Sequence, residues 1–427
     1  MNQENTPMTH NHPAPRYRYF KDVLADGFTI DWATATFIVG SHIAALVLGI
    51  WLIGAAPGHW VVAASVWAVL HAFIGSLATT AYTHRLIAHN AAKNIHNGVH
   101  WFFCAFAQIF AVQGSVRRWA ANHVIHHGVD RHGKHQLDPY SATWFEDTPR
   151  NFLWSHIVTF FFQHPESDEY KKAFKVKNHP ILQWQDNYFP LLLLFWIGIL
   201  PTGLGFALGS WTGLFALFGG SMIGTILGQH NTWTVNSVTH LWGFTKGLKS
   251  SAVNNYFWLG PLGEGNHHGD HHDYPRDYRN GFGVSGWLLD PTRYLILLFN
   301  SLGLVKDLNR ASKEQEAEII AKRKLANMQE KGFLAQKAAN FTPDTAALLT
   351  QLENKVLEMK KEWIEAVQKF EALKAESKIL AQASQHKNAI SDDLRQDIQT
   401  AKKQMQIKKE AFMSAVKSFS YQSVIYT

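Results

Sequence analysis

Two long apolar stretches dominate the pattern of hydrophobic and polar residues along the chain. No Asp, Glu, Lys or Arg occurs between positions 31 and 85, or between positions 186 and 246. A membrane-spanning helix needs about 20 largely apolar residues, so each stretch can hold two crossings and a tight turn. Pro57-Gly58 and Gly209-Ser210 supply suitable turn residues. The pattern therefore predicts four spanning helices, at residues 33–55, 60–82, 188–208 and 211–229.

The charges that flank these helices predict their orientation. Both connecting turns are uncharged, whereas the outer flanks are basic. Because Lys and Arg are enriched on the cytoplasmic side, we expect an integral multi-pass protein of a bacterial inner membrane with both termini in the cytoplasm. Two further apolar segments, 95–112 and 285–304, contain polar or charged residues that are costly inside a bilayer. We expect the first to lie at the interface or against the spans, and the second to pack on the cytoplasmic domain.

The chain changes character at about residue 311, where Lys and Glu become abundant. Apolar residues there alternate in steps of three and four, which predicts a coiled coil or a helical hairpin. We expect one helix to begin near Pro343, since Pro suits a first turn, and a second to cover residues 391–418. The stripe consists of Leu349, Leu352, Val356, Met359, Trp363, Ala366, Phe370 and Leu373.

These patterns predict an all-α membrane protein in three parts. A polar lead-in occupies residues 1–30, a membrane domain with a cytoplasmic helical cap occupies 31–307, and a helical extension occupies 308–427. The extension is either a module for self-association or a coiled-coil partner, or a helical tail without a partner.

Charge and cysteine content narrow the functional classes. The formal net charge is +7, but the basic residues lie beside the predicted spans, as membrane topology requires. We therefore expect no nucleic-acid partner. The single Cys104 excludes an internal disulfide framework and is typical of a reducing compartment or of the bilayer. No cleavable signal peptide is evident, because the first apolar run begins near residue 33 and is too long.

Nine histidines occur in four groups next to the predicted cytoplasmic ends of the spans. A His-x-x-His-His spacing, present twice, places imidazoles three and four residues apart on one helix face. Neutral imidazole is a common ligand of transition metals, and one zinc takes only three or four protein ligands. Nine ligands therefore indicate two metals, with a position left for oxygen or water. The nine are His84, His89, His123, His126, His127, His240, His268, His271 and His272.

Spacing alone leaves three questions open. His84 and His89 are separated by a rotation of about 140° on an ideal α-helix, so they converge only if the helix is ending or if they bind different metals. His267 and His268 compete for one ligand position. All-histidine ligation suits zinc, copper, nickel or iron about equally.

The residues around these histidines resemble the integral-membrane fatty acyl desaturases, specifically the acyl-CoA (stearoyl-CoA type) branch. The resemblance covers roughly residues 30–300. It departs from the family pattern where Asn266 and His267 intervene before His268, and where segment 128–136 is longer than usual. The matching motifs are His84-x4-His89, Trp119-x3-His123-x2-His126-His127, Asp138-Pro139-Tyr140-Ser141, Thr232-Trp233-x-Val235-Asn236-Ser237-x2-His240, and Gly263-Glu264-Gly265 leading into His268-x2-His271-His272.

The resemblance implies two iron ions held by the nine histidines, with O2 as co-substrate. It implies that Asn236 contacts one iron through a water molecule. It also implies a kinked tunnel for the acyl chain, with Trp119 and Thr232 at the bend and Gln113 nearby.

The activity implied is the insertion of a cis double bond, expected at Δ9, into a saturated chain carried most often by CoA, or by another acyl carrier. Arg117 and Arg118 either meet a phosphate of that carrier or face solvent. Electrons are expected from a separate cytochrome b5, ferredoxin or rubredoxin-type donor with its reductase, since the sequence has no flavin, nucleotide or haem fingerprint. One alternative is a membrane hydroxylase of alkanes or lipids. Another is a multispan metal transporter or sensor, whose ligands would lie near the bilayer midplane.

Overall fold

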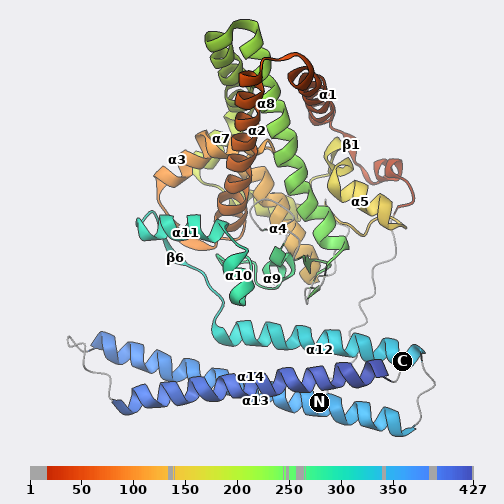
Figure 1. Cartoon of the computed structure of the whole chain (residues 1–427), viewed down its shortest axis with the longest axis vertical. Helices are drawn as coiled ribbons and strands as arrows, with labels where there is room; N and C mark the ends of the chain where they lie inside the picture. The colour runs from red at the N-terminus through yellow and green to blue at the C-terminus, as the bar shows by residue number, and fades with distance from the viewer. Residues whose placement is uncertain are drawn as a thin grey trace. The chain divides into compact units, whose positions relative to one another are not determined.

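The computed structural model describes residues 17–132, 138, 140–243, 245–246, 250–255, 264, 266–338, 343–383 and 392–425. Helices make up most of the chain (Figure 1). The chain forms two compact units, one ending at Arg310 and the other beginning at Ala311. Each unit has its own hydrophobic core.

The first two long helices match the first two predicted spans. They are α1 (Trp32–Ala55) and α2 (Gly58–Ala78), and α2 continues directly into the π-helix η2 (Thr79–Ala88). The Asp31 side chain accepts a hydrogen bond from the Thr34 amide and so caps α1. Both helices are long and apolar enough to cross a membrane, over 24 residues for α1 and 31 for α2 with η2. Their outer faces carry large apolar side chains.

The second pair of predicted spans lies in one long helical stretch, made of α7 (Pro180–Leu193), η6 (Leu194–Ile199) and α8 (Leu200–Leu241). A straight helix of these 62 residues would be about 93 Å long, three times the hydrocarbon core of a bilayer. Ser210 has φ 54° and ψ −144°, so the helix breaks there and the chain reverses (Figure 1). This stretch therefore consists of two helical segments joined by a reversal, and the reversal falls at the predicted turn Gly209-Ser210.

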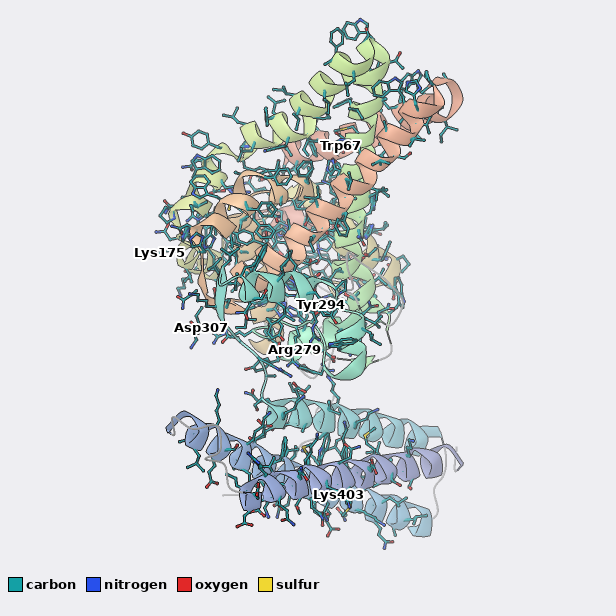
Figure 2. The ribbon with its side chains drawn as sticks, turned by 60° about the vertical axis from the view of Figure 1, so that its left-hand side comes forward. Trp67, Lys175, Arg279, Tyr294, Asp307 and Lys403 are labelled. Atoms are coloured by element: carbon teal, nitrogen blue, oxygen red, sulfur yellow. The ribbon has the colours of Figure 1, made fainter. Side chains whose placement is uncertain are left out.

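Small residues let these helices pack closely. Gly205 and Gly213 face one another across the reversal, where a side chain on either would meet the carbonyl oxygen of the other. Trp67, labelled in Figure 2, lies on α2. Its indole donates a 2.7 Å hydrogen bond to Ser221 Oγ of α8. This contact satisfies two polar groups in an otherwise apolar interface.

The segment at 95–112 is not one straight helix. It forms α3 (Asn97–Ala105) and η3 (Ala107–Ala111), followed by α4 (Val116–His132), with a bend of 72° between η3 and α4. Val112 adopts a left-handed conformation with φ 52° at this bend. Because of this bend, the axis of α4 points in a different direction from that of η3. Three of the nine histidines lie on α4.

Short elements complete the first unit. Within the described residues they include three two-stranded antiparallel sheets, which join segments far apart in sequence. The strand pairs are β1 (Thr29–Ile30) with β3 (Phe162–Gln163), β2 (Ala92–Ile95) with β6 (Val305–Leu308), and β4 (Thr245–Lys246) with β5 (Val253–Asn254). The remaining helices are η1 (Phe20–Asp26), α5 (Thr148–His156), η5 (Val158–Phe161), α6 (Asp168–Val176), α9 (His268–Asp273), α10 (Gly283–Leu288) and α11 (Thr292–Ser301).

The described part of the N-terminal lead-in is packed into the first unit. Tyr17, Val23 and Phe28 are buried in an aromatic cluster with Trp144 and Trp154. Hydrophobic periodicity does not predict this contact, because the burial comes from isolated apolar side chains in a polar segment.

The second unit is a bundle of three helices, α12 (Lys313–Ala338), α13 (Pro343–Ala383) and α14 (Asp392–Ile425) (Figure 1). Its core includes Val356 and Trp363 of the predicted stripe, with Trp363 stacked on Phe412 at 5.4 Å. The predicted helices from Pro343 and over residues 391–418 are present. We did not predict α12 as a separate helix.

Candidate metal centre

Four helical elements bring the nine histidines together. His84 and His89 lie on η2 and its C-terminal cap, whereas α4 carries His123, His126 and His127, and the last turn of α8 carries His240. The remaining three lie on α9. A π-helix pairs residues five apart, and the His89 amide donates to the His84 carbonyl at 3.1 Å. The wider π turn and the end of the helix at His89 together reduce the divergence of about 140° that an ideal α-helix would impose on this pair.

The nine imidazoles form two groups, and within each group the potential ligand atoms lie within 4.8 Å of one another. All nine side chains are buried. The first group consists of His84, His89, His123, His127 and His271, and the second of His126, His240, His268 and His272.

The distances between the imidazole nitrogens fit coordination to a metal ion better than they fit hydrogen bonds between the rings. His271 Nε2 lies 2.8 Å from His84 Nε2 and 3.2 Å from the Nε2 atoms of His89 and His127. A neutral imidazole has a single N–H, so it cannot donate to all three. Nitrogens held about 2.1 Å from one metal stand about 3.0–3.4 Å apart. The spacing therefore fits a shared metal ion.

The protonation state also favours metal binding. Burial lowers the pKa of His268 and His271 well below the usual histidine value, and neighbouring imidazoles lower it further. These rings are therefore neutral at pH 7, which is the form that coordinates metals. A set of nine imidazoles is compatible with two iron ions.

Side chains behind the rings fix their orientation. His126 Nδ1 lies 3.0 Å from Asp138 Oδ2, and His240 Nδ1 lies 2.9 Å from Ser251 Oγ. Because Nδ1 is occupied by this contact, Nε2 remains available to a metal. The contact also determines which ring nitrogen carries the proton. His84 Nδ1 lies 3.5 Å from Glu264 Oε2, a looser version of the same arrangement.

Glu264 belongs to a buried ion-pair network around Arg85. The Arg85 guanidinium, which is fully buried, contacts Glu264 Oε1 and Asp290 Oδ1, each at 2.7 Å. Burial alone would raise the pKa of Glu264, but Arg85 and His84 lower it to about 2. A charged carboxylate is therefore held behind the His84 ring.

The structure distinguishes His268 from His267. His268 lies in the second group, with its Nε2 3.0 Å from His240 Nε2 and 3.1 Å from His272 Nε2. His267 lies outside both groups, and its Nδ1 is 3.2 Å from Asp270 Oδ2. With Asn266 and His267 both intervening before the last histidine box, His268 is therefore the residue with ligand geometry.

A small cavity of about 30 Å³ lies between the two histidine groups. His84 and His123 from the first group and His268 from the second line it, together with Asn236 and Thr232. The side chains expected at a tunnel bend are hydrogen-bonded in series. Trp119 Nε1 donates to Gln113 Oε1 at 3.1 Å, and Gln113 Nε2 donates to Thr232 Oγ1 at 2.8 Å.

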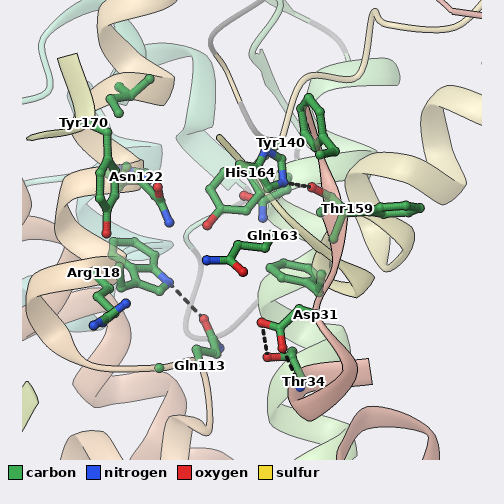
Figure 3. Close-up of a pocket in the computed structure, with 18 of the residues that line it drawn as sticks. Asp31, Thr34, Gln113, Arg118, Asn122, Tyr140, Thr159, Gln163, His164 and Tyr170 are labelled. Atoms are coloured by element: carbon green, nitrogen blue, oxygen red, sulfur yellow. Dashed lines mark hydrogen bonds between the residues drawn. The ribbon is translucent and has the colours of Figure 1, made fainter. Parts of the chain in front are cut away.

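A larger cavity of about 610 Å³ adjoins the small one. Trp119, His123 and Asn236 line both. Its other end is bordered by exposed residues, among them Asp26, Gln163 and Glu166. Figure 3 shows Tyr170, Asn122 and Arg118 on one wall, and Asp31, Thr34 and Thr159 on the other. The volume is typical of cavities that bind small molecules.

Comparison with known proteins identifies the family. The family model for fatty acid desaturases matches residues 65–289, which include all nine histidines. The chain belongs to the fatty acid desaturase family. This desaturase is 34% identical over 245 residues to the sn-2 palmitoyl-lipid 9-desaturase of Nostoc sp. (strain 36), a match that covers 56% of the chain and 78% of the relative.

Two other relatives show the range of named activities. The desaturase is 28% identical over 292 residues to the sn-1 stearoyl-lipid 9-desaturase of Anabaena variabilis, covering 67% of the chain and 96% of that relative. It is 28% identical over 257 residues to stearoyl-CoA desaturase 5 of Bos taurus, covering 58% of the chain and 72% of that relative. The desaturase is thus similar both to acyl-lipid and to acyl-CoA enzymes.

The two arginines expected near the substrate differ in position. Arg117 packs over the Phe174 ring at 4.0 Å and donates to the Lys177 carbonyl at 3.1 Å. Arg118 lines the larger cavity and forms a 3.0 Å ion pair with Asp186. Of the two, only Arg118 therefore borders the cavity.

Some residues of the site carried no signal in the sequence. Arg85 contacts both Glu264 and Asp290, which come from two distant segments, and Lys177 donates hydrogen bonds to the carbonyls of Ile87 and Ala88 beside His89. The one available clue was Asp290, a charge inside the otherwise apolar segment 285–304. Such a residue needs a buried partner.

Proposed function

We propose that this protein is an O2-dependent di-iron desaturase that introduces a cis double bond at Δ9 into a saturated fatty acyl chain. The observation that carries the proposal is the cavity system: a space reaching the surface ends against two converging histidine groups. The names of the relatives, all three of them 9-desaturases or a stearoyl-CoA desaturase, support the reaction and its position.

We assign each histidine group to one iron. His84, His89, His123, His127 and His271 would hold the first, and His126, His240, His268 and His272 the second. Asn236 lines the cavity beside both groups and would reach one iron through a water molecule. The bound irons supply the activation of O2 that an unactivated C–H bond requires.

The stoichiometry fixes what else the reaction needs. The –CH2–CH2– unit gives up two hydrogen atoms, and these, together with two electrons and two protons from outside, reduce O2 to two water molecules. The two electrons come from a separate donor of the cytochrome b5, ferredoxin or rubredoxin type, with its reductase. The enzyme would work at a membrane with its termini in the cytoplasm, and the helical extension at 308–427 would serve association.

The chain's own residues position the substrate and exclude water. Trp119 stacks on His123 at 4.7 Å, and its link through Gln113 to Thr232 joins the N-terminal part of α4 to α8. This hydrogen-bonded wall would bend the acyl chain and set which methylene pair faces the irons. The closed, dry end of the cavity would protect the reaction from side products.

The test is production of monounsaturated acyl chains by the full-length protein. In a desaturase-deficient host and with purified iron-loaded protein, we expect products that are two hydrogens lighter than the saturated chain. Products heavier by one oxygen would indicate a hydroxylase. Rapid metal exchange without O2 consumption would indicate a transporter or sensor.

A further inference from the structure

The charges at the entrance of the larger cavity bear on the acyl carrier. The charged residues among its described lining are Asp26, Asp31, Glu166 and Arg118. Three are acidic, and the one arginine is already paired with Asp186 at 3.0 Å. Burial also lowers the pKa of His164 to about 4, so this lining ring is neutral. The described lining of the larger cavity, which includes the exposed Asp26 and Glu166, therefore has a negative formal charge.

Such an entrance does not suit a polyphosphate. Protein sites for phosphate present arginine, lysine or helix N-termini to the anion, and like charges in close contact are repulsive. CoA carries several phosphate charges. Lys171 and Lys172 follow Tyr170 on α6, but they do not line the cavity.

The uncharged lining suits a polar neutral head group instead. Asn122, Gln163, Tyr140 and Tyr170 all line the cavity, and Figure 3 shows them around its interior. Their amide and hydroxyl groups both donate and accept hydrogen bonds, as ester carbonyls and glycerol or sugar hydroxyls require. These are groups that a neutral lipid presents.

The cavity also lies where a lipid can reach it. Thr34, Phe37 and Ile38 form part of its wall and belong to the first two turns of α1, the first candidate span. An entrance beside the start of a spanning helix is at the level of the membrane interface. An acyl chain can therefore enter while its glycerol backbone stays at the membrane surface.

We propose that the acyl chain reaches this site on an uncharged glycerolipid and that Asp26 and Glu166 select against CoA. The proposal rests on the proposed desaturase function and names its substrate class. It replaces the expectation of acyl-CoA as the carrier.

Binding to the purified full-length protein tests this selection without requiring turnover. Three probes share one stearoyl chain: 1-stearoylglycerol, 1-stearoyl-lysophosphatidate and stearoyl-CoA, compared in mixed micelles at equal mole fraction. We expect 1-stearoylglycerol to bind at least about tenfold more tightly than stearoyl-CoA, with lysophosphatidate between them. Tighter binding of stearoyl-CoA by the wild type would overturn the proposal.

A series of charge substitutions tests whether the acidic residues at the cavity entrance cause this difference in affinity. Three variants make the entrance less negative: Glu166→Gln, Glu166→Lys and Asp26→Asn. The affinity for stearoyl-CoA relative to that for stearoylglycerol should rise as the net charge of the entrance becomes more positive. The rise should be largest at low salt. Glu358→Lys/Glu365→Lys, in the second compact unit, is the matched control and should leave that ratio unchanged. A flat series would refute the role of these carboxylates.

Two further results would distinguish a failure of the carrier proposal from a failure of the desaturase function. If the phosphates of CoA dock on α6, Lys171→Glu/Lys172→Glu will weaken stearoyl-CoA binding in the wild-type background, which contradicts the proposal. If no probe yields an unsaturated product with iron and electrons supplied, the desaturase function fails, whereas the binding order still decides the carrier class.

Discussion

At the scale of single residues, the metal centre depends on which nitrogen of each ring is already engaged. His126 and His240 use Nδ1 for a carboxylate and a hydroxyl, and present Nε2 to the neighbouring rings. His267 instead directs its Nδ1 to Asp270 and lies outside both groups. Two adjacent histidines thus have different surroundings.

Replacing each of these neighbours separately should give different results. His268→Ala should reduce bound iron from two to about one per chain and lower product formation by more than about 100-fold, since even residues behind a ligand cost 10–100-fold. His267→Ala should retain both irons. Iron content per purified chain is the measurement, and equal iron loss in both variants would contradict the assignment.

The Arg85–Glu264 pair makes a prediction about pH. The pKa of Glu264 is lowered to about 2 in the folded protein, below its ordinary 4.5. Its contribution to stability is therefore present above pH 4.5 and is lost as the pH falls toward 2. A shift of this size corresponds to about 3 kcal/mol.

Glu264→Gln should consequently unfold at a lower temperature than the wild type at pH 7, and the difference should shrink as the pH falls through the range from 4.5 to 2. Thermal unfolding at a series of pH values measures this. A difference between the two proteins that is constant with pH would show that the carboxylate charge is not what stabilises the network.

At the scale of elements, the π-helix η2 decides whether His84 and His89 can act together. The sequence shows both histidines and their spacing, but it cannot show a π-helix, because the wider turn is stabilised by distant groups. Lys177, almost 90 residues away, donates to the carbonyls at its C-terminal end.

Deletion of Ile87 tests this element. Removing one residue turns His89 by about 100° relative to His84, so the first histidine group should lose its iron while the second keeps its own. We expect about one iron per chain. His89→Ala is the matched control for loss of one ligand. Two irons in the deletion variant would show that the π-helix is not needed for convergence.

The apolar runs predicted the spans, and Gly209-Ser210 marked the reversal, because both are local signals. The histidine boxes predicted the nine clustered rings for the same reason. The aromatic contacts of Tyr17 and Phe28, and the salt bridges of Arg85, were not predictable. They join segments more than 100 residues apart, and nothing in either segment specifies the other.

At the scale of the whole molecule, the two compact units have separate cores, so damage to one should spare the other. Trp363 is 3% exposed in the core of the second unit. Trp363→Ala should destabilise the bundle by about 3–5 kcal/mol without changing the iron content. Leu357→Ala, an exposed change on the same helix, should have little effect. Calorimetry with iron analysis measures both, and coupled loss would contradict independence.

From Ser210 to Leu241, α8 is about 48 Å long, whereas the hydrocarbon core of a bilayer is about 30 Å thick. The C-terminal part of α8, which extends beyond this thickness, carries Thr232, Asn236 and His240. Bilayer thickness is therefore linked through α8 to the second histidine group: a thicker membrane would shift this helix along the membrane normal, and with it His240 and Thr232.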